Sequence, residues 1–472
     1  MVVGDIATGI ELLVVGGGPG GYVAAIRAAH LGMDVTLVER TDALGGICLN
    51  HGCIPSKALI HAADLYHSMK VGGEMGILTQ GLSVDLKAMM KWKAGVVGRL
   101  TDGVSKLCKA NGVNVIHGDL VFTSERTAQI SRGETVENLE FEKAIIATGS
   151  RSIELPGMET DGEAILSSTE ALALDEIPSR LIVVGGGYIG LELGTFYAKV
   201  GSHVTIVEMM DSLLPGVDPD LVRVVVKRLK AIEVETRLST TVKGMERSPQ
   251  GVRVEIADGN GSRSLTAEKV LVAVGRRPNN SGFGLEKTGA ALDEKGFIRI
   301  DERCRTSVSH LYAIGDVAGE PLLAHKASRE GIVAAEVIGG LKSERDWQSV
   351  PAVIFSDPEI ATVGLSEAAA VAQGYEVIVG RFPFSASGKA LAINRTEGFV
   401  KIVSERSTRR ILGVRIVGPE ASTLISEGAL AVEMAATLDD VALTIHPHPT
   451  LPETFMEAAE AAEKKAIHIL NK

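Results

Sequence analysis

The sequence predicts an α/β protein with two parallel-sheet units of one plan, followed by a C-terminal region of mixed α+β structure. Three observations support this prediction. A pattern of strand, glycine-rich turn and helix occurs twice, and each landmark of the second copy lies 169 residues after its counterpart. The pattern ends near residue 346, after which short strand-like and helical stretches alternate. The 472 residues are enough for about three domains.

The first copy begins with an apolar strand that runs into the turn GGGPGG. Gly16, Gly18 and Gly21 of this turn match G-x-G-x-x-G, and the strand after the following helix ends at Glu39. The first glycine permits the tight turn, the second admits a pyrophosphate, and the third lets helix and strand pack closely. The helix N-terminus offers free N–H groups to phosphates, and Glu39 can accept hydrogen bonds from a ribose. The unit therefore resembles a Rossmann dinucleotide-binding unit.

The second copy has Gly185, Gly187 and Gly190 in the turn GGGYIG, and its second strand ends at Glu208. One such motif is weak evidence, whereas two complete copies are strong evidence for two dinucleotide sites. The alternative is that both are only tight strand-to-helix turns.

The acid of the second copy favours NAD over NADP. Glu208 would repel a 2′-phosphate, and Met209 and Met210 follow it where an NADP enzyme is expected to offer arginine. Arg276 and Arg277 lie elsewhere in the sequence and keep NADP open as an alternative.

Both units also end alike. Residues 142–149, which end in Ala147-Thr148-Gly149, resemble residues 268–275, which end at Gly275. The offset is now 126 residues, so the first unit is 43 residues longer inside. Cys48 and Cys53 lie in this longer interior, near the first cofactor site.

The two cysteines form a close pair in GGICLNHGCIPSK. Pro55 suits the first turn of a helix, so Cys53 should lie near a helix N-terminus, where the dipole favours a thiolate. Lys57, one turn further on, adds positive charge. A metal site needs more ligands, and no second cysteine pair exists. We interpret the pair as a redox dithiol, with two unrelated buried thiols as the alternative.

Charge and composition narrow the class of protein. The net charge of −11 argues against a nucleic-acid partner, and Cys108 and Cys304 are isolated. The N-terminus lacks the features of a secretory signal, and no apolar run approaches the roughly 18 residues of a membrane helix. We expect a cytoplasmic enzyme that does not enter a membrane.

The C-terminal segment His446-Pro447-His448-Pro449-Thr450-Leu451-Pro452-Glu453 has two interpretations. Thr450 and Glu453 fit a capping box, with Pro452 in the first helical turn. A dithiol substrate, however, must lose a proton before it attacks a disulfide, and histidine is a base of near-neutral pKa. Both interpretations stay open on these residues alone.

The dithiol segment closely resembles the redox-active motif of the class I pyridine nucleotide-disulfide oxidoreductases. The two dinucleotide units, Ala147-Thr148-Gly149 and the pair Gly315-Asp316 after an apolar strand also fit, so the resemblance covers essentially the whole chain. Within the family the chain is most similar to the NAD-linked members that oxidise dihydrolipoamide, judged by residues 48–50, 54–57 and 446–453.

The resemblance implies FAD at the first unit and NAD at the second. It places Glu39 on the adenosine ribose of FAD and Asp316 near its ribityl-pyrophosphate portion. It further implies an ion pair between Lys57 and Glu192 beside the flavin, with Tyr188 shielding the flavin until nicotinamide enters. From the residues alone, Glu192 would be only a helix residue.

The resemblance also implies four domains and a homodimer. The expected domains are an FAD-binding domain with the dithiol (1–150), an NAD-binding domain (151–270), a central domain that completes the FAD site (271–345) and a dimerisation domain (346–472). The expected partners are lipoyl-bearing protein domains and the acyltransferase core of a 2-oxo acid dehydrogenase complex, or a glycine cleavage complex.

For the reaction, the resemblance makes His448 the base and Glu453 the carboxylate that orients it. The substrate thiolate would attack Cys48, and Cys53 would face the flavin. Four residues depart from the usual family pattern: Ile47, His51, Pro447 and Pro452. The other functions considered are a mercuric or glutathione-type reductase, a transhydrogenase without a working dithiol, and a docking subunit without catalysis.

Overall fold

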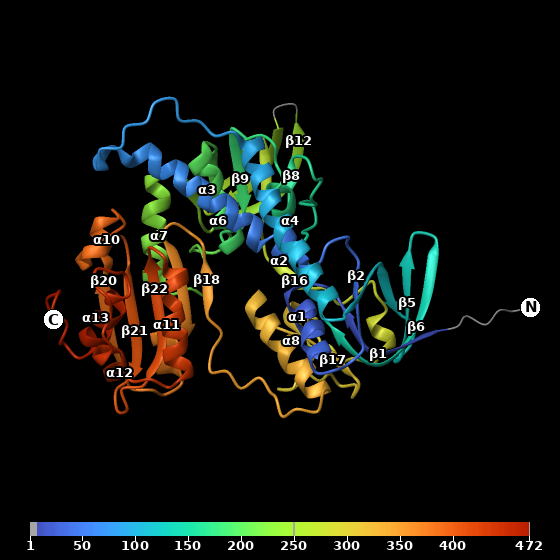
Figure 1. Ribbon diagram of the computed structural model, residues 1–472. Coiled ribbons are helices and arrows are strands. Elements are labelled where there is room, and N and C mark those ends of the chain that lie inside the picture. The colour runs from blue at the N-terminus through green and yellow to red at the C-terminus, as the bar shows by residue number, and fades with distance from the viewer. Residues whose placement is uncertain (1–6, 249–250, 472) are drawn as a thin grey trace, which may run out of the picture.

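The computed structural model describes residues 7–248 and 251–471. The first six residues, part of the N-terminus that lacks signal-peptide features, lie outside the described residues. The first parallel sheet has the spatial order β3 (Asn114–His117), β2 (Val35–Glu39), β1 (Thr8–Val15), β6 (Thr135–Ile146) and β17 (Leu311–Ala313). β4 (Asp119–Phe122) and β5 (Thr127–Arg132) extend it as antiparallel strands from the first half of β6. β17 brings residues from beyond the second unit back into the first sheet (Figure 1).

Helices α1 (Pro19–His30) and α8 (Ala324–Ile338) pack against each other beside this sheet. A Cβ atom at Gly331 would lie 2.5 Å from the carbonyl oxygen of Gly20, so this close contact requires glycine. Between β2 and β3 the chain forms α2 (Gly46–Asn50), α3 (Cys53–Val71), η1 (Gly72–Met75) and α4 (Leu86–Ala110). These helices contain the dithiol segment.

The second parallel sheet has the spatial order β11 (Glu235–Arg237), β10 (His203–Val207), β9 (Arg180–Val184), β15 (Lys269–Val272) and β8 (Ile165–Leu166). The predicted division at residue 270 falls inside β15. The accompanying helices are α5 (Ser168–Ala171), α6 (Tyr188–Val200) and α7 (Pro219–Ala231). A three-stranded antiparallel sheet follows β11, made of β12 (Thr241–Ser248), β13 (Gly251–Asp258) and β14 (Gly261–Ala267). β7 (Ser150–Ser152) and β16 (Arg276–Pro278) pair where the chain passes between the two units.

The C-terminal domain is built on an antiparallel sheet. Its spatial order is β18 (Ala352–Ile354), β19 (Glu359–Gly364), β22 (Ile411–Gly418), β21 (Phe399–Glu405) and β20 (Val377–Pro383). The helices are α9 (Glu367–Ala372), α10 (Gly388–Ala392), α11 (Ala421–Glu433), α12 (Leu438–Leu443) and α13 (Glu453–Ala462). Among the described residues, the other 3-10 helices are η2 (Leu285–Lys287), η3 (Gly315–Val317) and η4 (Phe384–Ala386), of which η4 lies in the C-terminal domain. The predicted fold class, two parallel α/β units and a C-terminal α+β domain, is confirmed.

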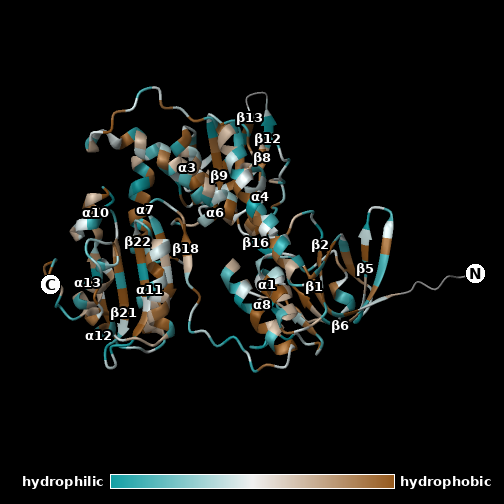
Figure 2. Cartoon of the chain, viewed as in Figure 1, coloured by the Kyte–Doolittle hydropathy of each residue, from teal (hydrophilic) through white to brown (hydrophobic). Residues whose placement is uncertain are grey.

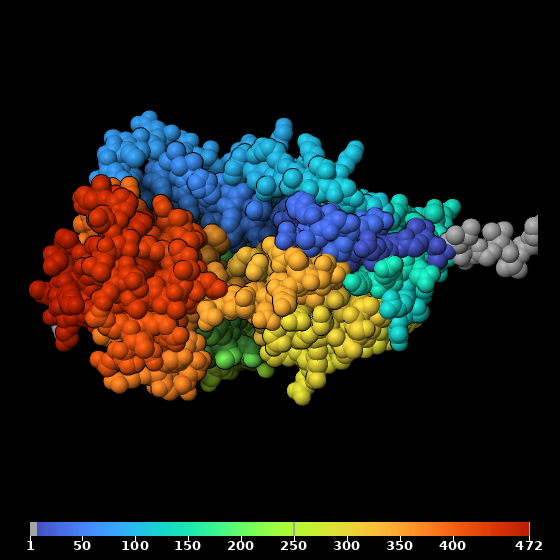
Figure 3. All heavy atoms as spheres, turned by 60° about the horizontal axis from the view of Figure 1, so that its bottom comes forward, coloured from blue at the N-terminus to red at the C-terminus, as the bar shows by residue number. Residues whose placement is uncertain are grey.

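The central strand of the C-terminal sheet is well covered. β22 is buried along its whole length, because α11 contacts it and its sheet neighbours shield its edges. The hydropathy colours agree, with brown strands such as β9 inside and teal concentrated toward the surface (Figure 2). The C-terminal residues gather in one lobe, and beside it orange residues lie between the blue N-terminal residues and the yellow central ones (Figure 3). Within the described ranges, no helix combines the length and apolar character that a membrane span needs.

Candidate active site

A cavity of about 600 Å³ runs along the carboxyl ends of the first sheet to the dithiol. It brings together most of the residues predicted for the first cofactor. Those that line it are Gly16, Gly18, Glu39, Cys48, Cys53, Lys57, Ala147, Thr148, Gly149, Tyr188, Glu192 and Asp316. The volume lies within the range of small-molecule and cofactor sites, roughly 300–1,000 Å³.

The three positions of the first turn require glycine for different reasons. A Cβ atom at Gly16 (φ +104°) would lie 2.4 Å from the oxygen of Ala147, and one at Gly21 would lie 1.8 Å from the oxygen of Gly16. Both are therefore required by the protein's own packing. At Gly18 the nearest atom is the Cα of Gly46, 3.9 Å away. The space in front of Gly18 is not needed for packing and is available to a pyrophosphate.

The second turn repeats this arrangement. A Cβ atom at Gly185 (φ +107°) would lie 2.3 Å from the oxygen of Ala273, and one at Gly190 would lie 2.1 Å from the oxygen of Gly185. A Cβ atom at Gly187 would have no neighbour within 4 Å. Gly187 is the N-cap residue directly before α6, and no side chain caps that end of the helix. Both units thus present an open, uncapped helix N-terminus.

The two acids hold the glycine turns of their own units. Glu39 and Glu208 are buried, and their Oε2 atoms accept hydrogen bonds from the N–H groups of Gly17 (2.7 Å) and Gly186 (2.6 Å). The other oxygen of each accepts a backbone N–H two residues further on. Sequence reasoning assigned these acids only to a ribose and missed this structural role. The equal spacing from glycine to acid in both copies is the signal that could have revealed it.

The thiols lie at the junction of α2 and α3. Both are free, and Cys53 is the first residue of α3, as the sequence predicted. The hydrogen bond from Cys48 lowers the pKa of Cys53 to about 7; burial opposes this effect, and the positive charge of Lys57 adds to it. The same hydrogen bond and burial raise the pKa of Cys48. The pair therefore consists of one acidic thiol and one proton-donating thiol.

The reduced protein should acquire one thiolate as the pH rises through about 7, below the usual thiol pKa of about 8.5. The rate of alkylation by iodoacetamide, followed from pH 5 to pH 10 in the reduced, unaltered protein and located at Cys53 by peptide mass spectrometry, measures this titration. Replacing Lys57 by Met should move the midpoint upward, because the ammonium group favours the thiolate. A midpoint at or above that of a free thiol would contradict the assignment of Cys53.

An ion pair joins the dithiol helix to the second unit. Lys57 Nζ lies 2.7 Å from Glu192 Oε2, which agrees with the contact that the resemblance implied. Glu192 Oε1 accepts the N–H of Phe355 at 2.9 Å, and the ammonium lies 4.5 Å from the centre of the Phe355 ring. Glu192 is nearly inaccessible to solvent. The ion pair is therefore buried, and it is held by contacts from α3, α6 and the segment that contains Phe355.

Asp316 lines the same cavity. Its Oδ2 accepts the hydroxyl of Ser150 at 2.6 Å, and that hydroxyl oxygen also accepts from Arg276 Nε at 2.9 Å. Arg276 is thus engaged at the first cofactor cavity. Tyr188, the first residue of α6, lines the same cavity and is 44% exposed.

His448 and Glu453 form a pair on the C-terminal domain. His448 Nδ1 lies 2.8 Å from Glu453 Oε1, and its side chain is 78% exposed. Burial would raise the pKa of Glu453, but hydrogen bonds from Thr450 and His448 outweigh it and lower the pKa. An ionised carboxylate only accepts, so Nδ1 carries the proton and Nε2 keeps its lone pair.

The capping-box interpretation is wrong in its reciprocal part. Glu453 Oε2 does accept the N–H of Thr450 at 2.8 Å. The Thr450 hydroxyl, however, donates to the oxygen of Pro447 at 2.6 Å, and α13 begins only at Glu453, after Pro452. Glu453 therefore ties the loop and orients His448 at the same time.

The first histidine of the segment has a different environment, which sequence reasoning missed. His446 Nε2 lies 2.8 Å from Glu427 Oε1, and Nδ1 lies 2.9 Å from the oxygen of Thr444. Its side chain is only 5% exposed. No spacing in the sequence links Glu427 to His446, so no local signal could have found this pair. Of these two histidines, only His448 has an exposed side chain.

Within one chain, His448 and the thiols lie apart. The loop before α13 lies in the left lobe of the molecule, whereas α2 lies at its centre (Figure 1). Neither His448 nor Glu453 lines the dithiol cavity. Among the described residues, no group of three or more His, Cys, Asp or Glu side chains is placed to hold a metal ion.

Comparison with known proteins identifies the family to which the chain belongs. Residues 10–331 match the pyridine nucleotide-disulphide oxidoreductases, and residues 350–459 match the dimerisation domain of that family. The chain belongs to this family. Its C-terminal match indicates a homodimer.

Relatives within the pyridine nucleotide-disulphide oxidoreductases narrow the type. The dihydrolipoyl dehydrogenase of Haloferax volcanii is 52% identical, and that of Geobacillus stearothermophilus is 49% identical, each over 100% of both chains. The solved structure of LpdA from Mycobacterium tuberculosis has a TM-score of 0.89 at 29% identity, covering 96% of this chain and 99% of that one. The chain is thus of the dihydrolipoyl dehydrogenase type.

Pyridine nucleotide-disulphide oxidoreductases of this type use FAD and NAD, and the residues present fit both. The unfilled space in front of Gly18 and Gly187, with an uncapped helix N-terminus at each, suits two pyrophosphates. The first cavity continues from Glu39 to the dithiol, as a flavin dinucleotide requires.

Proposed function

We propose that this protein oxidises protein-bound dihydrolipoamide to lipoamide and reduces NAD to NADH. The observation that carries the proposal is the pair of thiols of unequal acidity at the N-terminus of α3, in the same cavity as the first glycine turn. The names of the most similar relatives agree with this activity. A steady-state assay of the purified protein with dihydrolipoamide tests it, and no NADH formation would refute it.

In the oxidised state, Cys48 and Cys53 form a disulfide. A substrate thiolate attacks Cys48 Sγ, the disulfide bond breaks, and Cys53 leaves as a thiolate. The second substrate thiol then attacks the mixed disulfide, which releases lipoamide and returns Cys48 as a thiol. The depressed pKa of Cys53 suits it to be the leaving group.

His448 is proposed as the base that takes the proton from the substrate thiol. Its Nε2 is exposed and keeps its lone pair, because Glu453 holds Nδ1. Since His448 lies apart from the thiols of its own chain, we assign it to the dithiol of the partner protomer. Glu453 fixes the tautomer and stabilises the imidazolium that forms.

The cofactor residues have the following proposed roles. Glu39, Asp316 and residues 147–149 bind FAD, whereas Glu208 and Gly275 bind NAD. When bound, FAD would accept the electron pair of the reduced dithiol and deliver it to NAD as hydride. Tyr188, which lines the same cavity, would cover the flavin until nicotinamide enters. Lys57 and Glu192 hold a positive charge and a fixed carboxylate beside the thiols.

The partners follow from the substrate. A dihydrolipoamide group is carried on a protein, so the homodimer would serve lipoyl-bearing domains and dock on the acyltransferase core of a 2-oxo acid dehydrogenase complex, or act in glycine cleavage. We propose a cytoplasmic location, because in a reducing compartment a structural disulfide is disfavoured and a close cysteine pair is more often catalytic or metal-binding.

Nucleotide choice should depend on Glu208. The unaltered protein should strongly prefer NAD, and Glu208→Arg should weaken that preference, because the carboxylate that repels a 2′-phosphate is replaced by a cation. The ratio of kcat/KM for NAD to that for NADP measures the effect. Because Glu208 also holds Gly186, the circular dichroism of the variant serves as the control. Equal use of both nucleotides by the unaltered protein would refute this role.

A further inference from the structure

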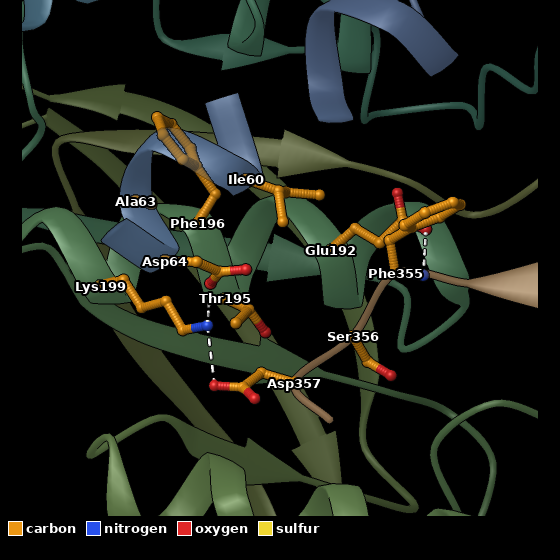
Figure 4. Close-up of a pocket in the computed structure, with 10 residues that line it drawn as sticks. All are labelled: Ile60, Ala63, Asp64, Glu192, Thr195, Phe196, Lys199, Phe355, Ser356 and Asp357. Carbon is orange, nitrogen blue, oxygen red and sulfur yellow. Dashed lines mark hydrogen bonds and ion pairs between the residues drawn. The ribbon is translucent and has the colours of Figure 1, made fainter. Parts of the chain in front are cut away.

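Phe355 contacts both members of the Lys57–Glu192 pair, although it belongs to the part of the chain that matches the dimerisation domain. It directly follows β18, and its N–H donates to Glu192 Oε1 at 2.9 Å (Figure 4). Its ring centre lies 4.5 Å from Lys57 Nζ, within the roughly 6 Å over which an aromatic face attracts a cation. Phe355 thus holds the carboxylate through its backbone and the ammonium group through its side chain.

The segment after β18 is anchored by Asp357, two residues beyond Phe355. Its carboxylate is buried and contacts three cations, which are Lys199 at 2.8 Å, Arg228 at 3.0 Å and Arg395 at 2.6 Å. Burial would raise the pKa of Asp357, but these cations outweigh it and hold the pKa far below its usual range. Lys199 and Arg228 belong to α6 and α7, so the charged carboxylate fixes the segment against two helices of the second unit (Figure 4).

Lys57 connects this arrangement to the dithiol. The titratable and charged side chains that interact with Cys53 come from α2, α3 and α6, namely Cys48, Lys57, Tyr188 and Glu192. The hydrogen bond from Cys48 has the largest effect and lowers the pKa of Cys53, and the charge of Lys57 lowers it further. The ring of Phe355 contacts the ammonium group of Lys57, which is the cation that favours the Cys53 thiolate.

We propose that Phe355 is a positioning residue, which holds Lys57 and Glu192 beside the dithiol. Asp357 in turn fixes Phe355 against the second unit. The inference rests on the proposed function, in which Cys53 leaves as a thiolate. The C-terminal domain thus acts on the dithiol of its own chain, in addition to supplying the proposed base to the partner protomer.

Phe355→Leu tests the ring in the FAD-loaded, reduced protein, because leucine removes the aromatic face but keeps the backbone N–H and an apolar side chain. The midpoint of the Cys53 titration is measured by alkylation and by the long-wavelength absorbance expected of a thiolate beside the flavin. It should rise by about half a pH unit, less than in Lys57→Met. Phe355→Tyr, which keeps the ring, should restore the midpoint. An unchanged midpoint in Phe355→Leu would overturn the proposal.

The double variant Phe355→Leu/Lys57→Met separates positioning from a general disturbance of the site. If Phe355 acts through Lys57, adding Phe355→Leu to Lys57→Met should leave the Cys53 midpoint where it is, because the ammonium group that the ring holds is already absent. A further rise in the double variant would show that Phe355 acts by another route, and the positioning role would be lost.

Asp357→Asn tests the anchor, with Asp220→Asn as the matched control. Asp220 of α7 pairs at 2.8 Å with Lys401 of β21, so both substitutions remove a carboxylate from an ion pair between the second unit and the C-terminal domain. Loss of a negative charge by itself would lower the Cys53 midpoint, whereas release of Phe355 should raise it. Both variants should lower the denaturation midpoint, but only Asp357→Asn should raise the Cys53 midpoint.

The outcomes of these titrations remain separate from the proposed function. A fall or no change of the Cys53 midpoint in Asp357→Asn, or an equal rise in Asp220→Asn, would overturn the anchoring role. If Asp357→Asn does not fold, Phe355→Leu still decides the positioning role. The titrations use no dihydrolipoamide, so a lack of dihydrolipoamide oxidation by the unaltered protein would refute the proposed function alone.

Discussion

Replacing either Cys48 or Cys53 by serine is expected to abolish dihydrolipoamide oxidation, because the disulfide that accepts the substrate's electrons cannot form. The two variants should nevertheless differ in colour. In Cys48→Ser, the Cys53 thiolate remains free beside the flavin and should give a long-wavelength absorbance band without reduction. In Cys53→Ser this band should be absent. The serine hydroxyl can donate a hydrogen bond in place of the Cys48 thiol, and the positive charge of Lys57 also favours the Cys53 thiolate.

Cys108→Ala provides the matched control for these variants. Cys108 is fully buried in the first unit, where burial raises its pKa to about 11. It should therefore stay a thiol at neutral pH and contribute neither to the band nor to turnover. Absorbance spectra from 450 to 700 nm, recorded with the steady-state assay, separate the outcomes. A band in Cys53→Ser that is missing from Cys48→Ser would exchange the assignments of the attacking and the flavin-facing sulfur.

The sequence predicted the fold well because the two units repeat. A single glycine turn would be ambiguous, but two copies with equal spacing from Gly16 to Glu39 and from Gly185 to Glu208 indicate where the strands and the helix lie around each turn. The packing confirms why the spacing is constant: each acid hydrogen-bonds to its own turn. Strand and helix positions are fixed by these local contacts, and local contacts are what a sequence pattern records.

Contacts between distant segments of the chain could not be predicted from the sequence pattern. The pairing of Glu192 with Lys57 came only from the resemblance, because the two residues are 135 positions apart and no local pattern links them. The buried cluster of Lys199 and Asp357 was not anticipated at all. Such contacts depend on how three domains pack together, and a charged residue on a helix looks the same in sequence whether it faces solvent or another domain.

The C-terminal histidines show the same limit within a short segment. His446 and His448 are two positions apart, yet one is buried against Glu427 and the other is exposed beside Glu453. The sequence offered capping and base catalysis as competing interpretations of Glu453. In the structure, Glu453 accepts the Thr450 N–H, the one half of the capping box that forms, and also contacts His448 Nδ1, so its loop contact does not exclude a role in orienting His448.

A large loss of activity is also expected when His448, the proposed base, is replaced. Loss of a general base typically lowers the rate on the order of 10²–10⁴-fold, so His448→Ala should be nearly inactive. Because the side chain is 78% exposed, the variant should still fold and bind FAD, and its denaturation midpoint and yellow colour are the controls. Full activity of His448→Ala would show that the residue only belongs to the loop before α13.

Mixed dimers decide which protomer His448 serves. His448→Ala and Cys48→Ser should each be inactive alone. When equal amounts are unfolded and refolded together, random pairing makes about half of the dimers mixed under two-fold symmetry. If His448 acts on the partner's dithiol, each mixed dimer has one doubly damaged site and one intact site, which combines Cys48 of one chain with His448 of the other. About a quarter of normal activity should then return. If His448 acted within its own chain, both sites of the mixed dimer would stay damaged and no activity would return, even though native mass spectrometry detects the mixed species.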